Sequence, residues 1–139
     1  MQPCPSCETC VETCCHIAWC SEAGRTAAFA QSLEELELWF STNTTHPDIQ
    51  SMLLRYTQGR GTVTCLECAI SLDLPPVMQS LARSQDIVGW DHYMMGMIST
   101  QMAAVQSVYL LQHQSARPVS KWLSGLITQL LQVTHCQWI

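Results

Sequence analysis

The stretch PVSKWLSGLITQLLQVTHCQW, residues 118–138, has the most regular hydrophobic period in the chain. Its apolar residues recur at steps of three and four, which is the spacing of one face of an α-helix. That face consists of Val119, Trp122, Leu123, Leu126, Ile127, Leu130, Leu131 and Thr134. Because the face is wide, one neighbouring layer leaves its flank uncovered. We therefore predict a helix over residues 118–138 that is buried at its centre and binds a protein partner or a second copy of the chain through its flank, at Leu131.

The same spacing predicts a helix over about residues 23–41 and another after the polar connection that follows. The inner face of the first helix is expected at Phe29, Leu33, Leu36 and Phe40. The inner face of the second is expected at Ile49, Met52, Leu53 and Tyr56. Thr45 or His46 before Pro47 is a helix-start signal, and Gly59 and Gly61 end the second helix.

Cys65 and Cys68 form a C-x2-C pair, a spacing that also occurs in metal and redox sites. The surrounding residues 62–74 have the pattern of a short buried helix, and a free cysteine is commonly a small core residue. A thioredoxin-type site needs alternating strands and helices, which this sequence lacks. We interpret the pair as part of the core and not as a second metal site.

Three further helices are predicted before residue 118. One runs from Pro76 to about Ser84 and ends at a break over residues 85–86. The next covers residues 87–98, is apolar on more than one stripe and is expected at the centre of the bundle. Ser99 or Thr100 caps the third, which ends near Ser115. The expected inward residues of the first and third are Val77, Met78, Leu81, Met102, Val105, Tyr109 and Leu110.

These patterns predict an all-α fold in one domain, with a short N-terminal zinc knuckle (residues 1–22) followed by a compact bundle of about five or six helices (residues 23–139). The chain is 47% hydrophobic and only 12% charged, so little charge is available to cover long helices. Exposed apolar surface, and a partner that covers it, are therefore expected.

The N-terminal stretch has the composition of a metal site. Cys4 and Cys7 are separated by two residues, so a tight turn presents both thiolates to one tetrahedral ion. His16 and Cys20 lie four apart, which places them on the same face of a helical turn. Three thiolates and one imidazole suit zinc, and four protein ligands leave no open position for a catalytic water. The predicted cofactor is a structural zinc.

The motif residues Cys4-Pro5-Ser6-Cys7, Glu12-Thr13, His16 and Cys20 also resemble the zinc-binding region at the C-terminal end of non-LTR retroelement reverse transcriptases. The similarity covers about the first 25 residues. It implies zinc held by Cys4, Cys7, His16 and Cys20, in an accessory module that helps the reverse transcriptase engage nucleic acid. The sequence departs from the pattern at Cys10, Cys14 and Cys15, which are alternative ligands.

The extra cysteines leave two alternatives to zinc open. Cys4, Cys7, Cys10 and Cys14 have the C-x2-C-x2-C-x3-C spacing of an iron–sulfur site. Cys15 stands where the proline of that motif is expected, and the cluster leaves a histidine and a cysteine unused. The cysteines could also be thiols or disulfides that hold no metal.

Charge and motif content restrict the function classes. The net charge is −5, with one Lys and five Arg scattered along the chain, so binding of RNA or DNA by this piece alone is expected to be weak. No nuclease, polymerase, hydrolase or dinucleotide-binding motif occurs, which predicts a protein that is not an enzyme. Nine cysteines without a secretory segment, and no apolar run of about 18 residues, predict a soluble intracellular protein of the nucleus or cytoplasm that does not span a membrane.

Overall fold

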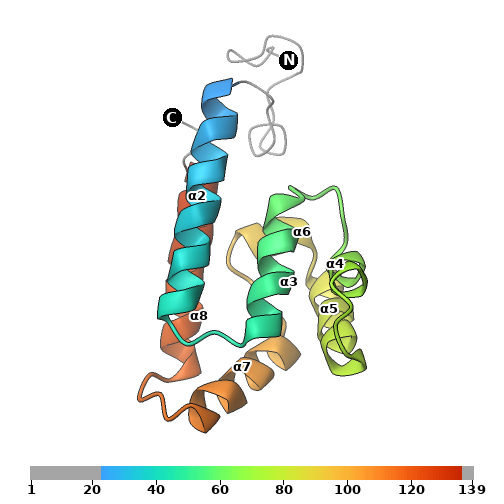
Figure 1. Ribbon diagram of the computed structural model, residues 1–139, viewed down its shortest axis with the longest axis vertical. Helices are drawn as coiled ribbons and strands as arrows, with labels where there is room; N and C mark the ends of the chain where they lie inside the picture. The colour runs from blue at the N-terminus through green and yellow to red at the C-terminus, as the bar shows by residue number, and fades with distance from the viewer. Residues whose placement is uncertain (1–22, 136–139) are drawn as a thin grey trace.

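The computed structural model describes residues 23–135, and over these residues it consists of α-helices with no strand (Figure 1). The helices are α2 (Ala23–Thr42), α3 (Pro47–Gln58), α4 (Cys65–Ser71), α5 (Pro76–Val88), α6 (Trp90–Met94), α7 (Thr100–Gln112) and α8 (Val119–His135). The all-α bundle is therefore confirmed for this part of the chain, with seven helices in place of the expected five or six. The predicted zinc knuckle lies outside the described residues.

The two longest helices, α2 and α8, pack side by side in opposite directions, so that the start of α2 and the end of α8 lie at the same end of the bundle (Figure 1). Trp39 of α2 lies across Gly125 of α8, where an added Cβ would come within 2.5 Å of the indole ring. The same ring packs on Trp122, with centroids 5.8 Å apart. The missing side chain of Gly125 therefore sets how closely the two helices approach.

One hydrophobic core contains residues from all seven described helices. The predicted inner faces of α2, α3 and α8 are confirmed at their central positions. These central, buried positions are Phe29, Leu36, Phe40, Ile49, Met52, Leu53, Tyr56, Trp122, Leu126 and Leu130. In α3 and α8 periodicity was sufficient because each of these helices has one apolar stripe and one polar face.

The predicted central helix over residues 87–98 was wrong. Helix α5 continues through residues 85–86 to Val88, and Gly89 then leaves the helical region with φ 90° and ψ 162°. The helix that follows, α6, has only five residues, of which Tyr93 is fully buried. Ile87, expected inside, is 88% exposed. The apolar run is divided between two helices and a loop because a glycine at positive φ interrupts it.

The expected break at residues 85–86 is also wrong, because Gln85 is a fully buried part of α5. Its Nε2 donates to the carbonyl of Met97 at 3.0 Å, and its Oε1 accepts from the amide of Ser99 at 2.8 Å. A buried side-chain amide thus supplies hydrogen-bond partners for the Met97 carbonyl and the Ser99 amide in the segment between α6 and α7. Val77 and Met78, on the first turn of the same helix, were both predicted to point inward. Val77 is 61% exposed and Met78 is buried, so of these two only Met78 is confirmed.

The predicted helix starts at His46 and Ser99 are confirmed. His46 Nδ1 accepts from the amide of Asp48 at 3.1 Å, and Ser99 Oγ accepts from the amide of Met102 at 3.1 Å. The connection before α3 is also held from α7, because buried Gln106 donates to the Thr44 carbonyl and accepts from the His46 amide, both at 2.9 Å. Each cap satisfies an amide that the helix leaves without an internal partner.

Candidate functional site

The predicted zinc ligands Cys4, Cys7, His16 and Cys20, and the alternatives Cys10, Cys14 and Cys15, all lie outside the described residues. Within residues 23–135, no group of three or more His, Cys, Asp or Glu side chains is arranged to hold a metal ion. The N-terminal metal site therefore stays a prediction.

Cys65 and Cys68 are free cysteines in the core, as predicted. Burial raises the pKa of the Cys65 thiol far above its usual range, and burial likewise raises the pKa of the Cys68 thiol to about 11. The start of α4 is occupied by Asp86, whose carboxylate oxygens accept from the amides of Cys65 and Leu66 at 2.7 and 3.0 Å. Reactive cysteines have a lowered pKa, so the environment of this pair is that of inert core thiols.

Other buried polar groups are also held by partners inside the fold. The hydroxyl groups of Thr57 and Tyr93 lie 2.8 Å apart in the core. The indole of Trp122 donates to Thr45 Oγ1 at 3.0 Å, which ties α8 to the connection between α2 and α3. Asp91 and His92, adjacent on α6, are both exposed. These buried hydrogen bonds join elements of the bundle.

The basic side chains described by the structure are dispersed. Arg55 donates to Ser71 Oγ at 2.7 Å, and Arg117 donates to Asn43 Oδ1. The Arg60 guanidinium lies over the Phe29 ring, 3.8 Å from its centroid. Arg83 and Lys121 are exposed on two different helices, α5 and α8. A nucleic-acid site needs clustered cations along one face, and these positions provide no such cluster.

An apolar groove lies between the end of α5, the segment 96–101 and α8, and encloses about 610 Å³. We call it the Met97 groove. Its large apolar lining residues are Ile87, Val88, Met97, Ile98, Leu123 and Ile127. The remaining described lining is glycine, serine, threonine and glutamine, so no charged side chain of the described chain faces the groove. An uncharged concave surface of this kind fits an apolar occupant.

Gly96 determines how this groove closes against α8. Its φ is 90°, and a Cβ placed on it would lie 2.4 Å from Ile127 Cγ1. The loop backbone therefore rests directly on the Ile127 side chain. One turn beyond Ile127, Leu131 is 51% exposed, so the apolar flank of α8 continues past the groove.

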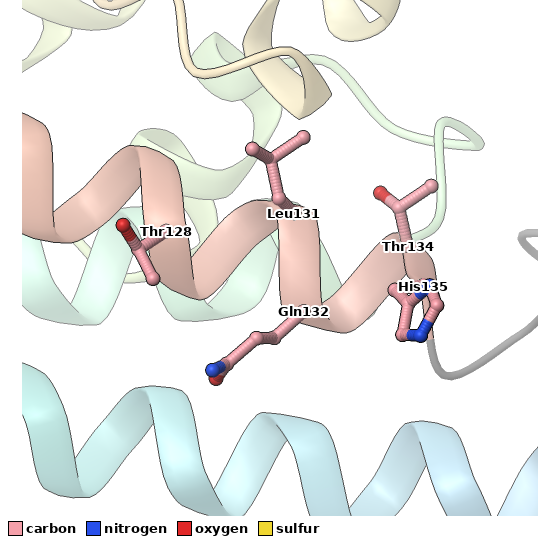
Figure 2. Close-up of a pocket in the computed structure, with 5 residues that line it drawn as sticks. All are labelled: Thr128, Leu131, Gln132, Thr134 and His135. Atoms are coloured by element: carbon pink, nitrogen blue, oxygen red, sulfur yellow. The ribbon is translucent and has the colours of Figure 1, made fainter.

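A second hollow, of about 500 Å³, lies at the C-terminal end of α8 (Figure 2). We call it the Leu131 hollow. Its described lining consists of Thr128, Leu131, Gln132, Thr134 and His135. Figure 2 shows Leu131 and Thr134 pointing away from α2, whereas Gln132 points toward it. The described lining side chains thus leave α8 on more than one side.

Comparison with protein-family models, with curated proteins and with solved structures finds no match to this chain. Over residues 23–135, each helix is shorter or less apolar than a bilayer-spanning segment must be. The functional interpretation therefore depends on the residues and surfaces of the chain itself.

The sequence placed the α8 residues of the Met97 groove on the correct helix face, but it placed the residues from α5 and the loop wrongly. Leu123 and Ile127 were predicted on the apolar face of the last helix, and both are half-buried. Ile87 and Met97 were assigned to a central helix, although Ile87 is the most exposed of the large hydrophobic side chains described. The glycines at positions 89 and 96, seven residues apart, were the available signal of a broken helix.

Proposed function

We propose that this chain is a non-enzymatic accessory module that binds the polymerase polypeptide of a retroelement through the Met97 groove. In this proposal, Cys4, Cys7, His16 and Cys20 form an N-terminal knuckle with a structural zinc. The thiolate ligands require a reducing compartment, the nucleus or the cytoplasm. The class of partner comes from the resemblance of the N-terminal motif to the zinc-binding region of reverse transcriptases.

The observation that carries the proposal is the lining of the Met97 groove, which is uncharged and in which six of the eleven described residues are large and apolar. Ile87 and Met97, which line the groove, are 88% and 49% exposed. Methionine is adaptable at binding surfaces because its side chain is unbranched and polarizable. A chain with few charges gains free energy when a partner covers such a surface, at about 25 cal/mol per Å² of apolar area.

The helical body supports binding to protein more than binding to nucleic acid. Its described basic residues are dispersed, and the full chain carries a net charge of −5. A zinc knuckle with three thiolates adds a site charge of about −1, which does not attract phosphate. Affinity for RNA or DNA is therefore expected to remain weak, with a dissociation constant above about 1 μM at physiological salt.

The proposal can be tested with a recombinant non-LTR reverse transcriptase that lacks its own C-terminal Cys/His region. Binding of the full chain to this polymerase is measured by biolayer interferometry, for the wild type and for Ile87→Glu. We expect the wild type to bind and Ile87→Glu to bind at least tenfold more weakly, because the new carboxylate must lose its water at the rim of an apolar groove. The fold tolerates the change, since Ile87 is on the surface.

Leu111→Glu is the matched control, because Leu111 is a 74% exposed apolar residue of α7 that does not line the groove. It should bind like the wild type. A parallel titration uses a single-stranded RNA of about 20 nucleotides, followed by fluorescence anisotropy at several salt concentrations. Tight, salt-resistant RNA binding, or equal effects of Ile87→Glu and Leu111→Glu, would contradict the proposal.

A further inference from the structure

Helix α7 has no charged side chain and is apolar on its outer side as well as on its inner side. Its sequence, TQMAAVQSVYLLQ, contains no Asp, Glu, Lys or Arg. Met102, Gln106 and Leu110 are buried on the inner side. On the outer side, Val108 is 52% exposed and Leu111 is 74% exposed. A helix that is apolar on both sides gains free energy when both are covered, and the bundle covers only one.

The exposed apolar residues of α7 form one surface, which we call the α7 outer face: Ala104, Val108 and Leu111. All three are exposed. Ala104 lies four residues before Val108 and Leu111 lies three residues after it. Ala104 and Leu111 are thus seven residues apart, close to two helical turns, so they lie on the same side of Val108. The face therefore has a small residue and a large one at nearly equal distances from its centre.

The size pattern of the α7 outer face is complementary to itself. A pair of identical subunits related by a two-fold axis uses the same patch on both, so the patch must match its own copy. When two α7 helices lie antiparallel with the axis beside Val108, Leu111 of each copy lies over Ala104 of the other. The small residue lets the helices approach, and the leucine fills the space above it.

Charge also favours a second copy as the occupant of this face. Two identical chains of net charge −5 repel each other, so they associate most favourably where the surface has no charge of its own. The Asp, Glu, Lys or Arg residues nearest to α7 in the sequence are Asp91 and Arg117, which leaves residues 92–116 without one. Figure 1 shows α7 at the end of the bundle away from the start of α2 and the end of α8.

We propose that two copies of this chain associate through the α7 outer face, with their α7 helices antiparallel about a two-fold axis beside Val108. One pair of helix faces buries less than about 1,200 Å², which is the range of weak and transient interfaces. The expected dissociation constant is about 1–100 μM, so the chain is monomeric at nanomolar concentrations. Since Ala104, Val108 and Leu111 do not line the Met97 groove, this interface and the proposed polymerase binding can fail independently.

The primary test is sedimentation velocity of the full chain, under reducing conditions, from about 1 to 500 μM. The wild type should shift from monomer to dimer over this range. Leu111→Glu should raise the dissociation constant about tenfold or more, because each copy then loses an apolar contact and must desolvate a carboxylate. Leu131→Glu is the matched control, since Leu131 is an exposed leucine of α8 outside the α7 outer face, and it should dimerise like the wild type.

Two further measurements test the antiparallel register. Ala104→Leu should also weaken the dimer about tenfold, because the added side chain fills the space that Leu111 of the other copy occupies, and the monomer tolerates it at an exposed position. In a mixture of isotope-labelled and unlabelled chains, a nuclear Overhauser effect between the Leu111 and Ala104 methyl groups of different copies is expected.

Three results would overturn the proposal. The first is a monomer at every concentration. The second is a dimer that Leu131→Glu dissociates and Leu111→Glu leaves intact, because the association surface is then on α8. The third is a dimer without the intermolecular contact between Leu111 and Ala104, because another face of the chain then forms it.

Discussion

Gly96→Ala is the substitution that most sharply tests how the Met97 groove is built. Gly96 has φ 90°, and its added Cβ would lie 2.4 Å from Ile127 Cγ1 and 3.0 Å from both Ile127 Cβ and Cγ2. Gly89 is the matched control, since it also has φ 90° but has no neighbouring atom within 4 Å of an added Cβ. Both alanine variants therefore place a side chain at positive φ, and only Gly96→Ala also meets Ile127.

The expected losses in the free energy of unfolding follow from two costs, the positive φ and the contact with Ile127. Placing a side chain at positive φ costs about 1–3 kcal/mol in the free energy of unfolding. Overpacking against a core side chain costs a further 1–3 kcal/mol or so. We expect Gly89→Ala to lose about 1–3 kcal/mol and Gly96→Ala about 2–6 kcal/mol, of a total stability that is typically about 5–15 kcal/mol for a domain. The smaller gain from restricting the unfolded chain is common to both variants.

Urea unfolding followed by circular dichroism provides the assay, with the slope checked to be unchanged between variants. A double-mutant cycle with Ile127→Ala isolates most of the contact, because this change removes Cγ1 and Cγ2 and leaves only Cβ of the three atoms that an alanine at position 96 would meet. In that background Gly96→Ala should cost about 1–3 kcal/mol less than in the wild type. Equal losses for the two glycine variants, together with no coupling to Ile127, would refute the proposed packing of the loop on α8.

Two further predictions concern the buried polar groups and thiols. Gln106→Met leaves the Thr44 carbonyl and the His46 amide without their buried partner, so urea unfolding should show a loss of about 2–5 kcal/mol, and an unchanged midpoint would contradict this role. Burial raises the pKa of Cys68 from about 9 to about 11, so the stability that depends on its neutral thiol should be present below pH 9 and lost between pH 9 and 11. Cys68→Ala should remove this part of the pH dependence, and identical alkaline profiles would argue against it.

The parts of the fold that one stripe of side chains determines could be predicted from the sequence. In α3, the four expected inner residues are all buried, and its start at His46 and its end at Gly59 follow from local signals. The burial of Cys65 and Cys68 could also be predicted, because the surrounding pattern is that of a short core helix. These features depend mainly on local spacing and turn chemistry.

The segment 85–98 could not be predicted because distant contacts determine it. Gln85 is a polar residue in an apolar run, and only the folded chain brings the Met97 carbonyl and the Ser99 amide to it. The Met97 groove likewise combines α5, a loop and α8, so no local period contains it. The zinc ligands were predicted from local spacing alone. They lie outside the described residues, so the zinc site stays a prediction.

The metal content of the full chain, purified under reducing conditions and measured by plasma emission together with a sulfide assay, tests the central claim most directly. The zinc-knuckle account predicts one zinc per chain in the wild type and in Cys65→Ser, and loss of zinc in Cys7→Ser and in His16→Ala. Iron with labile sulfide in the wild type, or loss of zinc in Cys65→Ser, would contradict the assignment of Cys4, Cys7, His16 and Cys20.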